Sequence, residues 1–293
     1  MRKIELSSSN KSIFLGTALW GWGIEKKEAF SMLDKFVELG GKFVDTAANY
    51  PINKKPVDFG LAVNWLSEWL KSGNSTSLSI LIKVGGKDNL GGSEAFLEES
   101  YLLSSVEKYQ NMFGSALSGI GIHFDNRSDE YEILKTVNVF KDLYNTGYDI
   151  GFSGIKFPDL YFKAAPALKD KWIIQVKENA LTSEARHSYN PYFPDSHYVA
   201  YGINMGGIKL DEPDSHSSIK IRNIKRTDEL VNKMRMMLEE EQKSLPLPTD
   251  LNEFALKRTY ANSALSGLII GPRNVHQLDN SMTFWNLLTK SSL

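Results

Sequence analysis

The sequence predicts an α/β fold in which eight parallel strands alternate with helices and close into a (β/α)8 (TIM) barrel. Two observations support this prediction. Short apolar runs recur along the whole chain, and they are continuous rather than alternating, as is typical of parallel strands buried on both faces. Amphipathic segments separate the runs, and no linker divides the 293 residues into two halves. We therefore expect a single domain, one barrel over residues 1–293.

Strands are expected where the apolar runs lie. In chain order these runs are residues 12–16, 42–45, 78–83, 119–123, 150–153, 172–176, 198–201 and 267–270. A further short segment, residues 3–6, precedes residues 12–15 across a Ser-Ser-Ser-Asn sequence. This segment is interpreted either as one arm of a hairpin or as an irregular lead-in.

Helices are expected between the strands, where apolar residues recur with the spacing of one helix face. In residues 26–39, for example, Phe30, Leu33 and Phe36 form one stripe. The same reasoning predicts helices over residues 57–70, 128–144, 226–242 and 274–288, a capped helix start at residues 249–253, and a long polar loop over residues 211–226. The runner-up fold is a doubly wound open sheet, which favours a glycine-rich turn after an early strand, and the chain contains no GxGxxG motif.

Composition and charge exclude several classes of protein. The 34 Lys and Arg residues nearly balance the 35 Asp and Glu residues, so no basic field would attract nucleic acid. The absence of cysteine excludes disulfides, thiolate catalysis and Cys-ligated zinc sites. No stretch of about 18 apolar residues is present to span a membrane, and the N-terminus lacks the apolar region of a signal peptide. We expect a cytoplasmic protein without nucleic-acid or membrane partners, and the sequence does not predict its oligomeric state.

The residues at the strand ends are the candidates for chemistry, because the active sites of such barrels lie at the carboxyl ends of the strands. Asp45, Lys83 and His123 end three successive strands, and Tyr50 follows Asp45 in the next loop. Each alone has a structural explanation, as a loop cap, a lysine that reaches for solvent, a structural histidine or a packed loop tyrosine. Together they converge on one mouth of the barrel, and we therefore interpret them as a catalytic set.

Such a set can deliver a proton to a carbonyl group. The ammonium of Lys83 beside the phenol of Tyr50 would stabilise the phenolate, and Asp45 would keep that lysine charged and oriented. The phenol can then protonate the alkoxide that forms as a carbonyl is reduced. His123, as a neutral donor, would orient the carbonyl oxygen. The set contains no source of hydride, so a cofactor must supply it.

Two motifs give the chain a resemblance to a known superfamily. Residues 14–21, Phe-Leu-Gly-Thr-Ala-Leu-Trp-Gly, and residues 43–50, Phe-Val-Asp-Thr-Ala-Ala-Asn-Tyr, resemble the first strand and the Asp–Tyr motif of the aldo-keto reductase superfamily. Lys83 and His123 lie in matching strand contexts, and the resemblance covers nearly the whole chain. It implies a (β/α)8 barrel, an NAD(P)(H) cofactor and reversible reduction of an aldehyde or ketone to an alcohol. By position it makes Tyr50 the proton donor, Lys83 and Asp45 its tuning pair, and His123 the residue that orients the carbonyl.

The resemblance also implies residues that bind the cofactor at the strand ends. Ser153 and Gln175 correspond to contacts of the nicotinamide carboxamide, although Gly154 stands where the family has an asparagine. Tyr201 corresponds to an aromatic ring that stacks on the nicotinamide. The glycine-rich loop that begins at Gly202 offers backbone amides to a pyrophosphate.

Residues 270–280 resemble the family's adenosine-phosphate loop and helix. Gly271 begins this loop, and Arg273 would contact a 2′-phosphate, since arginine forms geometrically specific bonds to phosphate. The N–H groups at the start of the last helix suit the same anion. Asn280 corresponds to an adenine-contacting asparagine but comes one residue early, and Ser281 is the alternative. The resemblance thus favours NADP(H) and leaves NAD(H) open.

The substrate is expected to contact the loops that follow the strands. We single out Trp20, Phe124 and Asn179 as candidates, with residues 185–197 as a candidate lid. Their mixture of aromatic and polar side chains favours a small carbonyl or alcohol substrate such as a sugar or a sugar derivative. Residues 51–60 depart from the family's usual glycine-rich stretch, so we expect this loop to affect substrate choice.

Two other functions remain open from the sequence. A non-catalytic NADP-binding regulatory subunit would carry the same four residues. A barrel hydrolase would bind a metal at His123 and Asp125, but the His-Phe-Asp spacing directs these side chains to opposite faces of an extended strand. We therefore expect no metal.

Overall fold

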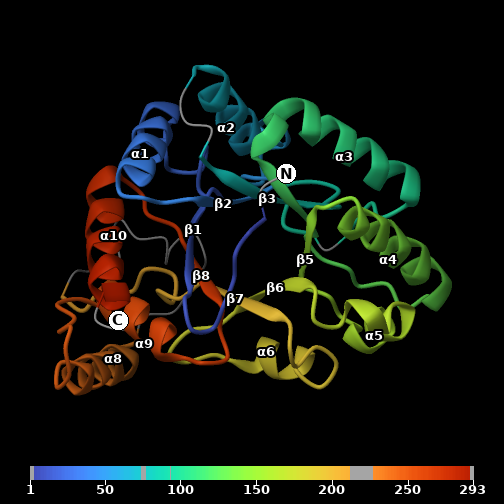
Figure 1. Cartoon of the computed structure of the whole chain (residues 1–293). Helices are drawn as coiled ribbons and strands as arrows, with labels where there is room; N and C mark the ends of the chain where they lie inside the picture. Colours follow the sequence, from blue (N-terminus) through green and yellow to red (C-terminus); the bar gives the residue numbers. More distant parts are fainter. Residues whose placement is uncertain (1–2, 74–76, 93, 212–226, 291–293) are drawn as a thin grey trace.

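Eight parallel strands of the described residues pair in chain order and close into a barrel, in which β1 also pairs with β8 (Figure 1). The computed structural model describes residues 3–73, 77–92, 94–211 and 227–290. The predicted (β/α)8 barrel is confirmed, and each predicted strand is present with ends that differ by at most two residues. The strands are β1 (Ser12–Gly16), β2 (Phe43–Ala47), β3 (Ser79–Val84), β4 (Leu117–Ile122), β5 (Asp149–Ser153), β6 (Trp172–Lys177), β7 (His197–Tyr201) and β8 (Gly267–Ile270).

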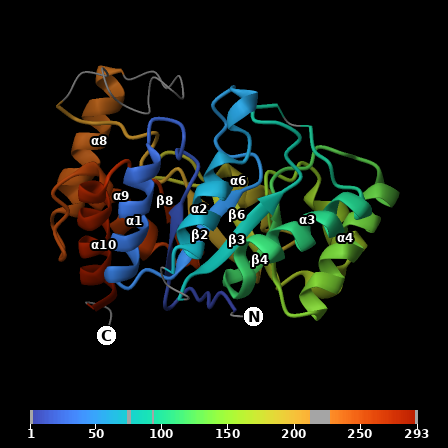
Figure 2. The same ribbon diagram turned by 90° about the horizontal axis from the view of Figure 1, so that it is seen from above.

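Helices surround the barrel and bury their apolar stripes against it. Figure 2 shows α9, α10 and α1 side by side, and α10 packs against both of the others. Of the stripe predicted for α1, Leu33 and Phe36 are fully buried and Phe30 is partly buried. The helices are α1 (Lys26–Glu38), α2 (Leu61–Lys71), α3 (Glu99–Phe113), α4 (Glu130–Asn145), α5 (Pro158–Ala164), α6 (Glu184–Tyr189), α8 (Asp228–Glu241), α9 (Leu251–Ala261) and α10 (Val275–Lys290).

The helix prediction is wrong or incomplete at several places. The helix expected over residues 57–70 is divided into a 3₁₀ turn, Pro56–Asp58, and α2, because Gly60 between them has φ 75°, outside the helical region. Helix α3 was not predicted, since its buried side includes Ser105 beside apolar residues and the stripe is weak. Helices α5 and α6 are too short for a periodic pattern, and α6 overlaps the start of the candidate lid. The polar loop expected over residues 211–226 lies outside the described residues except for Asp211.

The segment before β1 is an irregular lead-in rather than a hairpin arm. Residues 3–10 form no strand, and the Ile4 N–H donates to Asp149 Oδ2 at 2.6 Å. The Ile4 side chain is buried against inward-facing residues of four strands: Phe14, Leu81, Ile173 and Val199. The lead-in therefore fills the amino-terminal part of the barrel interior.

The interior changes from apolar to polar toward the carboxyl ends of the strands. Side chains of a strand alternate between its two faces, so the next inward residue after Leu81 on β3 is Lys83. On β6, Gln175 follows Ile173 in the same way. Gly121 on β4 makes room for this polar layer, because a Cβ there would lie 3.2 Å from the Gly151 carbonyl oxygen and 3.5 Å from Lys83 Cγ. The barrel thus encloses a lysine above an apolar base.

Candidate active site

Asp45 and Lys83 form a buried ion pair between neighbouring strands. Lys83 Nζ lies 2.6 Å from Asp45 Oδ1 and 2.6 Å from Oδ2, and the two side chains are only 3–4% exposed. Gln175 Nε2 on β6 donates to Asp45 Oδ1 at 2.5 Å, so the carboxylate is held by two donors from different strands. Burial lowers the pKa of the Lys83 ammonium, and the carboxylate of Asp45 opposes that shift. Asp45 is thus the group that favours the charged form of the lysine against the effect of burial.

Tyr50 and His123 complete the set that the sequence predicts. Lys83 Nζ lies 5.5 Å from the centroid of the Tyr50 ring. The rings of Tyr50 and His123 meet edge to face, with centroids 5.4 Å apart and an interplanar angle of 82°. The structure therefore brings all four residues together at the carboxyl ends of β2, β3 and β4. His123 follows the last residue of β4 rather than ending that strand.

A residue that the sequence analysis did not single out holds His123 in place. Asn49 is buried, and its Oδ1 lies 2.8 Å from His123 Nδ1 while its Nδ2 donates to the Asp88 carbonyl at 2.9 Å. Burial, helped by the positive charge of Lys83, lowers the pKa of His123 to about 3, so the imidazole is neutral at physiological pH. The sequence shows a polar residue directly before Tyr50, but the burial of this residue and its contact with His123 are seen only in the structure.

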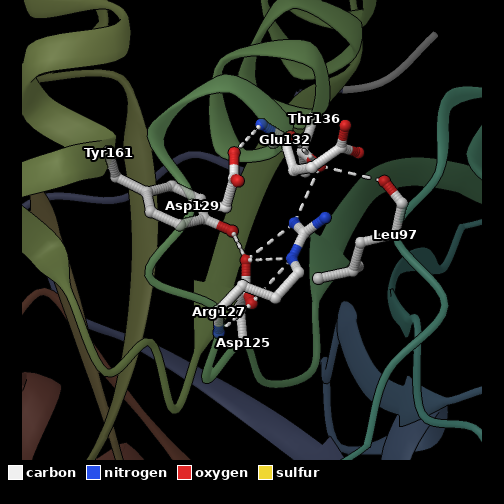
Figure 3. Close-up of polar contacts among 7 residues, drawn as sticks. All are labelled: Leu97, Asp125, Arg127, Asp129, Glu132, Thr136 and Tyr161. Atoms are coloured by element: carbon white, nitrogen blue, oxygen red, sulfur yellow. Dashed lines mark hydrogen bonds and ion pairs between the residues drawn. The ribbon is translucent and has the colours of Figure 1, made fainter.

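Asp125, the other half of the hypothetical metal site, is occupied by neighbouring side chains (Figure 3). Tyr161 Oη donates to Asp125 Oδ2 at 2.6 Å, and Arg127 donates from Nε to Oδ1 at 3.0 Å and from Nη2 to Oδ2 at 2.8 Å. Arg127 Nη2 also donates to Thr136 Oγ1 at 2.9 Å on α4. Asp125 and Arg127 thus fasten the loop after β4 to the helices, and neither carboxylate oxygen is available to share a metal with His123.

A search against protein-family models matches residues 12–292 to the aldo/keto reductase family. This chain belongs to the aldo/keto reductase family. A curated relative, the "Uncharacterized oxidoreductase YrpG" of Bacillus subtilis (strain 168), is 26% identical over 288 residues, which cover 92% of this chain and 85% of the relative. The chain is therefore an oxidoreductase of a family that generally uses NAD(P)H. Within its described residues no helix is long and apolar enough to cross a membrane.

In this aldo/keto reductase, the two expected carboxamide contacts lie side by side on β5 and β6. Ser153 Oγ donates to the Gln175 carbonyl oxygen at 3.4 Å, and both side chains are buried. Gln175 uses one Nε2 hydrogen on Asp45, which the sequence analysis did not predict. Gly154 has φ 60°, and a Cβ there would lie 3.2 Å from Phe124 Cβ, so its backbone conformation favours glycine at this departure from the family pattern.

Tyr201 and Gly202 lie at the end of β7. The Tyr201 ring is 37% exposed, which leaves a surface for the expected stacking on a nicotinamide. Gly202 has φ 69°, and its carbonyl oxygen accepts from Asn179 Nδ2 at 3.1 Å. Asn179 Oδ1 accepts from the Leu181 N–H at 2.9 Å. Asn179, expected to contact substrate, thus ties the loop after β6 to the loop after β7.

The start of α10 already holds a carboxylate. Glu28 on α1 accepts from the Val275 N–H at 2.7 Å, and the Asn274 side chain accepts from the Gln277 N–H at 2.9 Å. The Arg273 side chain lies against Gly23, where a Cβ would be 2.9 Å from Arg273 Nη2. Some of the backbone N–H groups expected to bind an anion therefore already donate to side chains of the protein. The contact with Glu28 was not predicted because this residue is remote in the sequence.

Asn280 and Ser281, the alternatives for an adenine contact, lie on different sides of α10. Asn280 is exposed, with Nδ2 3.5 Å from His276 Nε2. Ser281 is buried, accepts from Asn252 Nδ2 at 2.9 Å and donates to the Gln277 carbonyl at 2.8 Å. The hydroxyl of Ser281 is thus used within the protein, and Asn280 is the side chain that faces outward. Gly271 is exposed, and a Cβ there would meet nothing within 4 Å.

The two aromatic substrate candidates differ in position. The Phe124 ring is partly exposed, and its centroid lies 5.1 Å from that of the His123 ring, at the edge of the four-residue set. Trp20 is completely buried, and its Nε1 has no hydrogen-bond partner among the described residues. The ring of Trp20 therefore presents no surface to a substrate in this structure.

Proposed function

We propose that this chain catalyses the reversible, NAD(P)H-dependent reduction of an aldehyde or ketone to an alcohol. The observation that carries the proposal is the convergence of Asp45, Tyr50, Lys83 and His123 at one mouth of the barrel. When bound at this mouth, a nicotinamide cofactor would supply the hydride that the four residues lack. Tyr50 gives its phenolic proton to the carbonyl oxygen, and the proton returns to Tyr50 when the reaction runs toward the carbonyl.

The buried charge of Lys83 is what suits Tyr50 to this role. An ammonium 5.5 Å from the centre of the ring favours the phenolate that remains after proton transfer. Asp45 keeps Lys83 protonated, and Gln175 holds Asp45 from the opposite side. The barrel interior excludes water around this pair, so the interaction is stronger than at the surface.

For the cofactor, we propose NADP(H) on the basis of Arg273, and the carboxylate of Glu28 is the feature that opposes it. A guanidinium binds a 2′-phosphate strongly, whereas a carboxylate at the start of α10 would repel it. Exposed Tyr201 and partly exposed Phe124 suit the apolar faces of a nicotinamide and of a sugar or sugar-derivative substrate.

One experiment tests the proposal in two steps. NADPH and NADH are titrated into the protein while tryptophan fluorescence is followed, and cofactor oxidation is then measured with a panel of aldehydes and ketones. We expect binding and turnover in the wild type, and Tyr50→Phe should abolish reduction while leaving cofactor affinity nearly unchanged. Binding without turnover on any substrate would favour a non-catalytic NADP-binding subunit, and Tyr50→Phe with most of the wild-type rate would refute the proton-donor role.

A further inference from the structure

The amide of Asn49 lies between a backbone carbonyl and an imidazole nitrogen. The Asp88 carbonyl oxygen is 2.9 Å from Asn49 Nδ2, and His123 Nδ1 is 2.8 Å from Asn49 Oδ1. Asn49 is 1% exposed, and a Cβ on the neighbouring Gly86 would overlap its amide. The side chain is therefore tightly enclosed, and its orientation is set by what it contacts.

These contacts determine which nitrogen of His123 carries the proton. A carbonyl oxygen only accepts hydrogen bonds, so the amide group that faces the Asp88 carbonyl must be the NH₂. The amide oxygen then faces His123 Nδ1. An oxygen also only accepts, so Nδ1 must be the donor and must hold the ring proton. In the neutral ring, Nε2 on the other edge carries a lone pair and accepts hydrogen bonds.

This tautomer changes the role expected of His123. A ring nitrogen with a lone pair cannot donate to a carbonyl oxygen, and two acceptors facing each other repel. A hydroxyl group, by contrast, can donate to Nε2. Because the Tyr50 and His123 rings are in contact, a carbonyl oxygen bound at the Tyr50 hydroxyl would have its neighbouring carbon substituents close to His123.

We propose that His123 Nε2 accepts a hydrogen bond from a hydroxyl on the carbon next to the carbonyl, so that the site selects α-hydroxy aldehydes and ketones. Tyr50 donates to the carbonyl oxygen of the same molecule, and Asn49 acts as a positioning residue that fixes the tautomer. Hydride passes from NAD(P)H to the carbonyl carbon and the Tyr50 proton passes to the oxygen, which leaves a vicinal diol and NAD(P)⁺. This inference rests on the proposed carbonyl reductase function.

The substrate test compares three ketones of similar size. Hydroxyacetone offers a donor, methoxyacetone keeps the oxygen without its hydrogen, and butanone replaces it with carbon. We expect kcat/KM for hydroxyacetone to exceed that for each of the others by about twofold to twelvefold, the range that one hydrogen bond between neutral groups gives. Equal values for hydroxyacetone and methoxyacetone would overturn the inference while leaving carbonyl reduction intact. Failure of all carbonyl substrates would instead count against the proposed function.

The variant test removes the acceptor that fixes the tautomer. Asn49→Leu should lower the hydroxyacetone-to-methoxyacetone ratio toward one, because the ring can then carry its proton on Nε2. Asn262→Leu is the matched control, since the partly buried Asn262 also uses its amide in a hydrogen bond, to Glu178 at 2.8 Å, but does not contact His123. The control should keep the wild-type ratio. An unchanged ratio in Asn49→Leu would refute the positioning role.

A direct measurement of the tautomer needs neither turnover nor a folded variant at Asn49. Nitrogen-15 NMR of the histidine-labelled wild-type protein distinguishes protonated from unprotonated ring nitrogens, and the chain has only five histidines to assign. The resonance that disappears in His123→Asn identifies the ring. We expect a protonated Nδ1 and an unprotonated Nε2 at neutral pH, and a proton on Nε2 would overturn the inference.

Discussion

Replacing Asp45 by asparagine should destabilise the protein in a way that depends on pH. The carboxylate accepts from Lys83 at 2.6 Å and from Gln175 at 2.5 Å, and it is 3% exposed. A neutral amide at this position would leave the ammonium of Lys83 buried without a counter-charge, a loss that typically costs about 3–5 kcal/mol. Lys83 then folds more readily in its neutral form, since burial already lowers its pKa.

The magnitude follows from the work of removing the proton. Relative to an unfolded lysine of pKa about 10.4, a neutral lysine costs about 4.6 kcal/mol at pH 7 and about 1.9 kcal/mol at pH 9, or about 1.4 kcal/mol per pH unit. Because the pKa of Lys83 is lowered in the folded state, the unfolded chain binds a proton that the folded chain does not. The free energy of unfolding of Asp45→Asn therefore rises between pH 7 and pH 9. The wild type, with Lys83 paired, should change less.

Urea unfolding at pH 7 and pH 9, followed by tryptophan fluorescence, measures this difference. Asp170→Asn is the matched control, because Asp170 forms an exposed ion pair with Lys171 and should contribute less than about 1 kcal/mol. We expect the gap between the wild type and Asp45→Asn to narrow by more than about 1 kcal/mol from pH 7 to pH 9. An equal gap at both pH values would refute the reasoning that Asp45 stabilises a charged Lys83.

Two further predictions concern the cofactor and His123. In fluorescence titrations, Arg273→Ala should lower the affinity for NADPH far more than the affinity for NADH. Glu28→Gln should raise the affinity for NADPH selectively. Equal effects on the two affinities would refute these assignments. His123 has a pKa of about 3, below its usual value near 6.5, so the unfolded chain binds a proton that the folded chain does not as pH falls below 6.5. The free energy of unfolding should therefore fall less between pH 7 and pH 5 in His123→Asn than in the wild type. An equal fall in the two proteins would contradict a neutral His123.

The barrel, and the proximity of Asp45, Lys83, Tyr50 and His123, could be predicted because both depend on local patterns. Asp45 and Lys83 each follow an apolar run at an inward-facing position, and parallel strands bring their carboxyl ends together at one end of a barrel. The prediction of one helix over residues 57–70 was wrong because it also relied on a local pattern. Gly60 was interpreted as part of an amphipathic stripe, whereas it is the boundary between two helical segments.

Contacts between remote segments could not be predicted in this way. Glu28 caps α10 at Val275, which lies 247 residues further along the chain. Asn49 contacts the loop after β3 and the end of β4, and nothing in its neighbours indicates which of its two amide atoms faces which partner. Such pairings depend on the relative placement of strands and loops, so the sequence indicated candidate reacting groups but not the residues that contact them.

Gln175, which the resemblance assigns to cofactor binding, also has a contact within the protein that was not predicted. Its place on β6 beside Ser153 agrees with the expected carboxamide site, yet its Nε2 donates to Asp45. An amide nitrogen has two hydrogens and the side chain has an oxygen, so one bond to Asp45 leaves capacity for a second partner. A cofactor bound through Gln175 would therefore share a side chain with the Asp45–Lys83 pair. We infer that loss of this amide would weaken cofactor binding and proton delivery together, whereas loss of Ser153 should affect cofactor binding alone.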